Sequence, residues 1–300
     1  MNERVINCHF FIFIPNFLFS QSDYKLSVFN LNPIHFNPAY SGTLGELSAV
    51  GVHSSQFTNF EKSPRTQFLG LQYFIKDKNI GLGLDISNDQ FGIVKENNIN
   101  SNISYILRLN ENFRLSFGIK AGFKSILLDY SHLNIFDPDE DVFLEGFQRH
   151  TIPNLGFGLF IVSEEFNFGI SSPTFYTQDY KNIFTNKFSP ELVDYYATVG
   201  YNRILNSSYT LQSNILARVV DGAPYSAMIA LSVEYEESIL IGANFELDSS
   251  IGSLIGFKIF DNFYAGYAID FSINNFQKYN SGSHNFFLSY GPRSLRNSDL

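Results

Sequence analysis

The sequence has no tryptophan, and its one cysteine, Cys8, lies among the first 20 residues. If that stretch is removed on export, the mature chain can form no disulfide and no cysteine-based metal site. Long apolar runs are also missing: after Phe19 no window approaches the ~18 consecutive apolar residues that indicate a membrane-spanning helix. These absences exclude a disulfide-stabilised domain and a bundle of membrane helices.

Charge is scarce. Charged residues make up 16% of the 300-residue chain and leave a net charge of −9. Lysine and arginine form no stripe or basic helix that could neutralise phosphates. Nucleic acid is therefore not expected as a partner.

Aromatic residues are abundant, with 33 Phe and 17 Tyr in a chain that is 17% aromatic. A soluble protein would need a very large core to bury them. A transmembrane barrel instead turns half of every strand toward lipid and places aromatic side chains at both membrane interfaces. The composition therefore favours a membrane barrel.

The first residues have the pattern of an export signal. Arg4 precedes the mostly apolar stretch from Val5 to Phe19, which is too short to span a bilayer comfortably. Cleavage after Ser20 fits this pattern, although Leu18 departs from the small residue usually found near a cleavage site. We predict a signal peptide over residues 1–20, with a buried N-terminal strand as the alternative.

From Gly45 onward the dominant pattern is an alternation of period two, as in β-strands. In the run 80–87, Ile and Leu occupy one face and small or polar residues the other. The run 113–124 places Phe, Leu, Ile and Ala opposite a face that contains Arg114, Lys120 and Lys124. Three cations on one face would be costly in a packed sandwich, but they suit a hydrated lumen behind a lipid-facing surface.

Breaks in this alternation divide the chain into candidate strands. They run near residues 45–57, 65–75, 78–88, 97–109, 112–129, 151–163, 165–172, 193–204, 207–220, 224–236, 238–247, 250–259, 262–273 and 282–290. We therefore predict an all-β fold, a transmembrane antiparallel β-barrel of about fourteen strands over residues 45–290. An irregular segment at 21–44 precedes the barrel, and a tail at 291–300 follows it.

Short and long connections alternate along the predicted strands. Tight turns are expected at 76–79, 110–111, 163–165, 206–207, 236–238 and 260–262. Longer connections are expected at 58–64, 89–96, 130–150, 173–192 and 274–281, with 221–223 and 248–249 as short exceptions. Because bacterial outer-membrane barrels keep their short turns in the periplasm, both termini are expected there.

Motifs for catalysis are weak. Serine and histidine are neighbours at 53–55, 131–132 and 283–284. No Gly-x-Ser-x-Gly elbow accompanies them, and a serine–histidine pair is diagnostic only by its geometry. We predict that the protein is not an enzyme and has no catalytic residues.

Motifs for metals and cofactors are also weak. The acidic run 137–141 lacks the glycine and the bidentate glutamate of a calcium loop, so a solvated external loop is expected there, with opportunistic calcium binding as the alternative. The glycine pairs Gly81/Gly83 and Gly156/Gly158 fall within strands rather than in a phosphate-binding loop. We predict no metal site and no cofactor.

Several cations are predicted to face the lumen, namely Arg114, Lys120, Lys124 and Arg218. In an open pore they could select anions. The favoured interpretation is that they pair with lumenal carboxylates such as Asp85, Glu234 or Glu246.

The segment before the first predicted strand resembles a known family. Phe29-Asn30-Leu31-Asn32-Pro33, followed by Phe36-Asn37-Pro38-Ala39-Tyr40-Ser41-Gly42, is similar to the N-terminal signature of the PorP/SprF family of Bacteroidota outer-membrane proteins. Weaker matches follow in order at residues 63–67, 79–83, 115–118, 169–173, 221–224 and 282–290. The chain departs from the usual aromatic barrel terminus by continuing beyond Tyr290.

The resemblance implies a non-catalytic outer-membrane component of the type IX secretion system, or of the related gliding-motility machinery that delivers adhesins to the cell surface. The expected partners are the outer-membrane bilayer, periplasmic ring or peptidoglycan-anchored secretion components, and a secreted adhesin. A passive outer-membrane porin or solute transporter is the alternative, and a barrel enzyme is a third class.

The Asn- and Pro-rich segment is the candidate partner-binding site. We predict that residues 29–42 form a rigid plug or docking element, because their prolines restrict the backbone before binding. A plain irregular lead-in is the alternative, since Asn-Pro dipeptides initiate turns. The candidate residues are Asn32, Pro33, Asn37, Pro38, Ala39, Tyr40 and Gly42.

Overall fold

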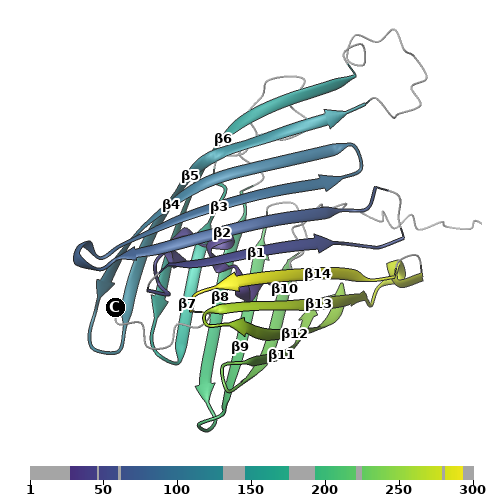
Figure 1. Ribbon diagram of the computed structural model, residues 1–300. Helices are drawn as coiled ribbons and strands as arrows, with labels where there is room; N and C mark the ends of the chain where they lie inside the picture. The colour runs from purple at the N-terminus through teal and green to yellow at the C-terminus, as the bar shows by residue number, and fades with distance from the viewer. Residues whose placement is uncertain are drawn as a thin grey trace, which may run out of the picture.

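The chain folds into a closed β-barrel (Figure 1). The structure is a computed structural model that describes residues 28–45, 47–59, 62–130, 146–175, 193–220, 225–278 and 281–292. Fourteen strands pair antiparallel in chain order, and β1 pairs with β14 to close the ring. The prediction of an antiparallel barrel of about fourteen strands is confirmed. In the part of the chain described, no helix is long and apolar enough to cross a membrane.

The strands carry almost all of the regular structure. They are β1 (Ser48–Ser55), β2 (Arg65–Ile75), β3 (Ile80–Phe91), β4 (Val94–Arg108), β5 (Arg114–Asp129), β6 (Phe147–Val162), β7 (Phe166–Ser172), β8 (Tyr195–Ile204), β9 (Tyr209–Val219), β10 (Ser226–Tyr235), β11 (Ile239–Glu246), β12 (Ser250–Phe260), β13 (Phe263–Ser272) and β14 (Ser283–Tyr290). The short helical turns are η1 (Phe29–Leu31), α1 (Pro33–Phe36), η2 (Pro38–Tyr40), η3 (Lys76–Lys78) and η6 (Asn275–Lys278).

The alternation in the sequence separates an outer face from a lumenal face. On β5, Ile119 is 66% exposed and Phe123 is 63% exposed, whereas the intervening Lys120 is 2% exposed. Because successive side chains of a strand point to opposite faces, the apolar residues lie outside and the cations inside. The outer surface is thus the one that lipid can cover.

The prediction of a longer connection at 89–96 is wrong. β3 continues to Phe91 and β4 begins at Val94, so only Gly92 and Ile93 join them. β6 likewise begins at Phe147 rather than near residue 151. The strands extend past the point where hydrophobic alternation stops, because backbone pairing does not require a lipid-facing side chain.

Two rows of cross-strand partners mark that point on the outer face. One row is apolar and consists of Ile86, Ile99, Phe123 and Pro153. The next outward-facing row is polar and consists of Asn88, Asn97, Ser125 and Thr151. β3–β6 therefore extend beyond the lipid-facing band into water.

The two ends of the barrel differ in their connections. At one end β2–β3, β4–β5, β6–β7, β8–β9, β10–β11 and β12–β13 are joined by tight turns, as predicted. We call this the short-turn end, and the opposite end the long-loop end. The predicted signal at 1–20, the acidic run at 137–141 and most of the tail lie outside the described residues.

Residues 28–45 occupy the short-turn half of the lumen, seen in purple inside the ring of strands (Figure 1). The segment contacts the inner faces of β3, β4, β5 and β6, and it also packs against strands of the opposite wall. We refer to residues 28–45 as the plug. The part of the predicted irregular segment that the structure describes thus lies in the lumen.

Candidate functional site

Proline and asparagine set the local shape of the plug. Pro33 begins α1 and Pro38 begins η2, where a missing backbone N–H costs nothing because the first turn of a helix leaves its N–H groups unpaired. Asn37 caps η2, since its Oδ1 accepts a hydrogen bond of 2.9 Å from the backbone N–H of Ala39. Its Nδ2 donates to the carbonyl of Leu159 on β6 at 3.0 Å. The Asn-Pro dipeptides thus form tight turns that are anchored to the wall.

Six of the seven candidate partner-binding residues are buried in the lumen. Asn32 and Ala39 are fully buried, and Asn37, Pro38, Tyr40 and Gly42 are buried as well. Pro33 is half-buried. In this arrangement the segment contacts the barrel itself, and only its exposed side is accessible to another molecule.

Lumenal glycines provide the seat for the plug. A Cβ added at Gly118 of β5 would overlap the backbone of Ala39, and one added at Gly81 of β3 would overlap the carbonyl of Ser41. A Cβ at Gly158 of β6 would overlap the side chain of Asn37. Glycine within a strand is typical of such a close approach. We call Gly81, Gly118 and Gly158 the glycine seat.

A buried ion pair lies beside the glycine seat. Lys120 Nζ is 2.9 Å from Asp85 Oδ2, and the same Nζ donates to the backbone carbonyl of His35 in the plug at 2.9 Å. Asn100 and Asn102 donate to the two carboxylate oxygens at 3.0 and 2.9 Å. A buried carboxylate needs such partners to offset its lost hydration. The pairing of Lys120 with Asp85 confirms the favoured interpretation of the lumenal cations.

Two of the other lumenal cations, Lys124 and Arg218, pair with carboxylates that the sequence did not single out. Lys124 Nζ is 2.9 Å from Glu96 Oε1, and Arg218 donates through Nε and Nη2 to Asp194 Oδ1 at 3.0 and 2.7 Å. Glu96 falls within the connection predicted at 89–96, but in the structure it points into the lumen from β4. The expectation that these cations pair with lumenal carboxylates is met, with Glu96 and Asp194 as the carboxylates observed.

Strand side chains also bind the plug backbone. Ser104 Oγ donates to the carbonyl of Ser41 at 2.6 Å, and Ser171 Oγ donates to the carbonyl of Phe36 at 2.8 Å. Gln72 Oε1 accepts from the N–H of Gly42 at 3.0 Å. Since loop-like backbone in a lumen has no ladder partner, these bonds satisfy groups that would otherwise be buried unpaired.

On the opposite side of the lumen the plug packs against apolar side chains. Val28, Phe29, Ile34 and Phe36 of the plug form one buried cluster with side chains from β1, β2 and β9–β14, namely Val50, Val52, Phe68, Leu216, Met228, Ala230, Leu240, Leu254, Ala268 and Phe287. The plug therefore bridges a glycine- and amide-lined wall and an apolar wall.

The model of the type IX secretion system membrane protein PorP/SprF family matches residues 18–290 of this sequence. The chain belongs to the PorP/SprF family. It is accordingly a membrane protein of the type IX secretion system. Its barrel lies in the outer membrane, and its partners are that bilayer and components of the secretion system. No curated protein matches the sequence.

Solved outer-membrane proteins are similar to this PorP/SprF member at low identity. The Ralstonia pickettii toluene transporter TbuX has 11% identity and a TM-score of 0.46, covering 85% of this chain and 91% of its own. The CymD monoaromatic hydrocarbon channel has 9% identity and a TM-score of 0.49, covering 88% and 94%. A Pseudomonas aeruginosa FadL homologue has 11% identity and a TM-score of 0.42, covering 85% and 92%. At these identities no function is transferred.

Two of the serine–histidine neighbours, at 53–55 and 283–284, lie outside the lumen of this PorP/SprF barrel, and the one at 131–132 lies outside the described residues. Ser55 Oγ lies 3.3 Å from His53 Nε2, and His53 is exposed on the outer face of β1. The His284 ring contacts the hydroxyl of Tyr267 from the neighbouring strand β13. Across the residues described, no group of three potential metal-ligating side chains comes together.

The glycine seat is the functional feature that sequence reasoning missed in this family member. The sequence identifies Gly81 and Gly158 as strand glycines and does not single out Gly118. A signal was present, because all three occupy lumen-facing positions on β3, β5 and β6. Small residues at such positions indicate that something approaches the wall closely.

Proposed function

We propose that this protein is a non-catalytic outer-membrane component that supports the export or surface attachment of adhesins and gliding motility. One observation carries the proposal: the chain's own N-terminal segment occupies the lumen and is bound to both walls. An open porin needs a continuous water-filled lumen, whereas an attachment component does not.

The two ends of the barrel support a role in bridging the membrane. Short turns of outer-membrane barrels lie in the periplasm, so the plug faces that compartment and any ring or peptidoglycan-anchored component. At the opposite end β3–β6 project a polar outer surface beyond the lipid-facing band, as at Asn88 and Asn97. This projection is the surface proposed to meet an adhesin outside the cell.

The placement of the reactive side chains supports the part of the proposal that gives the protein no catalytic activity. The pair formed by His53 and Ser55 lies on the outer face of β1, away from the lumen. A hydrolase would need its nucleophile and base beside donors that stabilise an oxyanion. A lipid-hydrolysis assay on the purified barrel tests this point, and turnover abolished by Ser55→Ala would overturn it.

The decisive experiment removes the plug. Deletion of residues 29–42 is expected to stop adhesin display and gliding while leaving a heat-modifiable barrel in the outer membrane. The matched control is Gly51→Ala, since a Cβ there meets no atom closer than 3.9 Å. Adhesin display that persists after the deletion would refute the proposed role of the plug.

Conductance separates the proposal from the porin alternative. In a planar bilayer the intact protein is expected to give no stable open pore, because the plug contacts both walls. A steady conductance from the intact protein, together with loss of solute uptake in a knockout that still displays adhesins, would favour the porin instead.

A further inference from the structure

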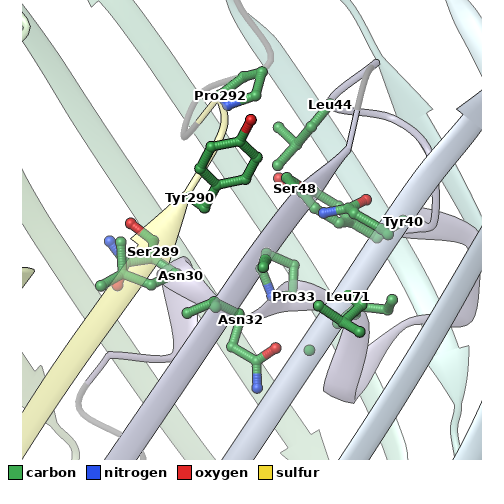
Figure 2. A pocket seen from close by; sticks show the side chains of 16 residues that line it. Asn30, Asn32, Pro33, Tyr40, Leu44, Ser48, Leu71, Ser289, Tyr290 and Pro292 are labelled. Carbon is green, nitrogen blue, oxygen red and sulfur yellow. The ribbon is translucent and has the colours of Figure 1, made fainter. Parts of the chain in front are cut away.

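The plug leaves little room for a ligand beside the seam where the barrel closes. Figure 2 shows the space between the plug and the ends of β1 and β14, with Asn32, Ser48 and Ser289 around it. That space measures about 30 Å³, which suits one or two buried water molecules. The three side chains have buried polar atoms, and buried water commonly satisfies such atoms. The surface open to a larger molecule is the outer face of the barrel.

Three strands of the outer face repeat one order of side chains toward the long-loop end. Each passes from an apolar residue through an uncharged polar residue to a cation, at every second position. The residues are Leu69, Gln67 and Arg65 on β2, Ile99, Asn97 and Lys95 on β4, and Pro153, Thr151 and Arg149 on β6. We call Arg65, Lys95 and Arg149 the basic row.

The alternation of each strand fixes the direction of the basic row. Thr66, Glu96 and Ile152 occupy the other set of positions on the same three strands and are buried on the lumenal side. Because successive side chains of a strand point to opposite faces, the three cations face outward. The side chain of Lys95 is 43% exposed, and Arg65 and Arg149 are exposed as well.

The basic row is continuous across the sheet. Cross-strand pairing places Gln90 between Arg65 and Lys95, and Leu127 between Lys95 and Arg149. Neighbouring strands are about 4.8 Å apart, so successive cations are about 10 Å apart. Two long cationic side chains can therefore reach one anion that lies over the uncharged residue between them.

The other side of the barrel lacks such a row. On β8–β13 the outward-facing strand residues nearest the long-loop end are uncharged, namely Tyr195, Val219, Ala227, Phe245, Ile251 and Phe271. Cations that only kept this end of the barrel soluble would be expected around the whole circumference. Their restriction to β2, β4 and β6 indicates a binding surface.

One carboxylate lies beside the basic row. Asp129 Oδ2 is 3.9 Å from Lys95 Nζ, and the two side chains are 28% and 43% exposed. Such an exposed pair contributes little, so Lys95 can exchange it for a doubly charged anion. The described outward-facing residues at this end of β2–β6 carry three cations against this one carboxylate. The surface is therefore net positive.

The position of the basic row beside the lipid-facing band identifies its ligand. Each cation lies four residues beyond an apolar side chain, about 13 Å along the strand and less along the membrane normal because barrel strands tilt. The row is thus at the level of lipid headgroups. With the short turns in the periplasm, these belong to the outer leaflet, where lipopolysaccharide carries phosphate groups on a disaccharide directly above its acyl chains. Arginine and lysine bind phosphate through charge-assisted hydrogen bonds.

We propose that the basic row binds the phosphate groups of outer-leaflet lipopolysaccharide, and that Gln67, Asn97 and Thr151 below it hydrogen-bond to the sugar and amide groups of the same lipid. The assignment to the outer leaflet rests on the orientation used in the proposed function, with the short turns in the periplasm. The lipid then holds the wall of β2–β6, and the strand ends beyond the basic row remain for an adhesin.

The test uses the purified full chain in detergent and two probes, lipid A with its phosphate groups and the same lipid A after enzymatic dephosphorylation. Native mass spectrometry measures the fraction of barrels that retain each lipid. Retention of the phosphorylated lipid is expected to exceed that of the dephosphorylated lipid by at least about tenfold. The difference should shrink as salt is raised, because exposed charges are screened.

Variants place the binding on the basic row. Arg65→Gln, Lys95→Gln and Arg149→Gln should each weaken retention of phosphorylated lipid A by about fivefold, and the triple variant by about thirtyfold or more. Asp129→Asn should act in the opposite direction, with retention about twofold to fivefold stronger, because Lys95 loses a competing partner. The matched control is Arg203→Gln, which removes an exposed outward-facing cation at the short-turn end of β8 and should leave retention unchanged.

Equal retention of the two lipids would overturn the proposal, and so would retention unchanged in the triple variant. A triple variant that keeps phosphorylated lipid A but loses adhesin display would assign the basic row to an acidic protein partner instead. The proposed function fails separately. If the lipid binds as expected but adhesin display survives deletion of residues 29–42, the lipid site stands and the role of the plug falls.

Discussion

The two halves of the barrel wall treat the plug differently. β3–β6 are 12, 15, 16 and 16 residues long, and they meet the plug with glycines, amides and the Asp85–Lys120 pair. β10, β11 and β14 are 10, 8 and 8 residues long, and with β1 they meet the plug through aliphatic and aromatic side chains. The contacts with the plug are thus mostly polar on the tall half and mostly apolar on the short half, although the lumenal face of the short half also carries polar side chains such as Glu234, Glu246 and Asp270.

The two kinds of contact have different effects on the plug. Polar contacts fix its position, and apolar contacts stabilise it there. Hydrogen bonds and close backbone contacts are directional, so the polar wall fixes where each turn of the plug sits. Burial of apolar surface is non-directional and roughly proportional to area, so the apolar wall stabilises the plug without fixing its register. Changes in the polar wall should therefore displace the plug, and changes in the apolar wall should loosen it in place.

The largest effect is expected at the glycine seat. Gly118→Ala would drive a methyl group into the backbone of Ala39, so the plug has to leave its position. In planar bilayers we expect a stable conductance from the variant and none from the parent protein. Gly51→Ala, on the outer face of β1, should leave the bilayer silent, and silence from Gly118→Ala as well would mean that the seat does not position the plug.

The next effect concerns the buried ion pair. Asp85→Asn leaves Lys120 without its counter-charge, and breaking a buried pair in this way costs about 3–5 kcal/mol of the free energy of unfolding. Urea unfolding followed by circular dichroism measures the loss. Replacing both partners, as Asp85→Asn with Lys120→Met, should restore part of it, because no unpaired charge remains.

A surface pair provides the control for that measurement. Lys95 Nζ lies 3.9 Å from Asp129 Oδ2, and both side chains are partly exposed. Asp129→Asn should change the free energy of unfolding by less than about 1 kcal/mol. Equal losses in Asp85→Asn and Asp129→Asn would show that the lumenal pair is as well hydrated as the surface one.

On the apolar wall, a truncation should weaken the fold without moving the plug. Leu240 is 1% exposed and belongs to the cluster around Phe36, and Leu240→Ala is expected to cost about 2–4 kcal/mol through lost contacts and the cavity left behind. Bilayer recordings should stay silent, in contrast to Gly118→Ala. Leu231→Ala, on the outer face of β10, is the control with less packing to lose. A stable conductance from Leu240→Ala would contradict the division between the two walls.

The sequence predicted the features that hydrophobic alternation encodes. It did not predict strand ends without such alternation, or contacts between segments that are distant in the chain. The lipid-facing band could be read because apolar and polar residues alternate there, as at Ile119 and Lys120. The ends of β3 and β4 were missed because their outer residues, such as Asn88 and Asn97, are polar, and a strand in water has no hydrophobic period. Their pairing continues all the same, through the backbone.

The same distinction holds in the lumen. Lys120 and Asp85 could be paired in advance because both fall on lumen-facing positions and carry opposite charges. Glu96 could not be paired with Lys124, since its strand had not been recognised. The close approach of Ala39 to Gly118 could not be predicted either, because no sequence spacing specifies where a plug meets the barrel wall.

The smallest effect is expected where the tall half leaves the membrane. Ile119 and Ser125 share the outer face of β5, but Ser125 belongs to the polar row beyond the lipid-facing band. Ser125→Arg should cost only about 0–1 kcal/mol, whereas Ile119→Arg should cost about 2–4 kcal/mol, because the charge then enters the bilayer interior. Unfolding in lipid vesicles, compared with unfolding in detergent, isolates this contribution of the bilayer. If Ser125→Arg were as costly as Ile119→Arg, the extra length of β5 would lie within the membrane, and the tall half would owe its height to tilt rather than to projection into water.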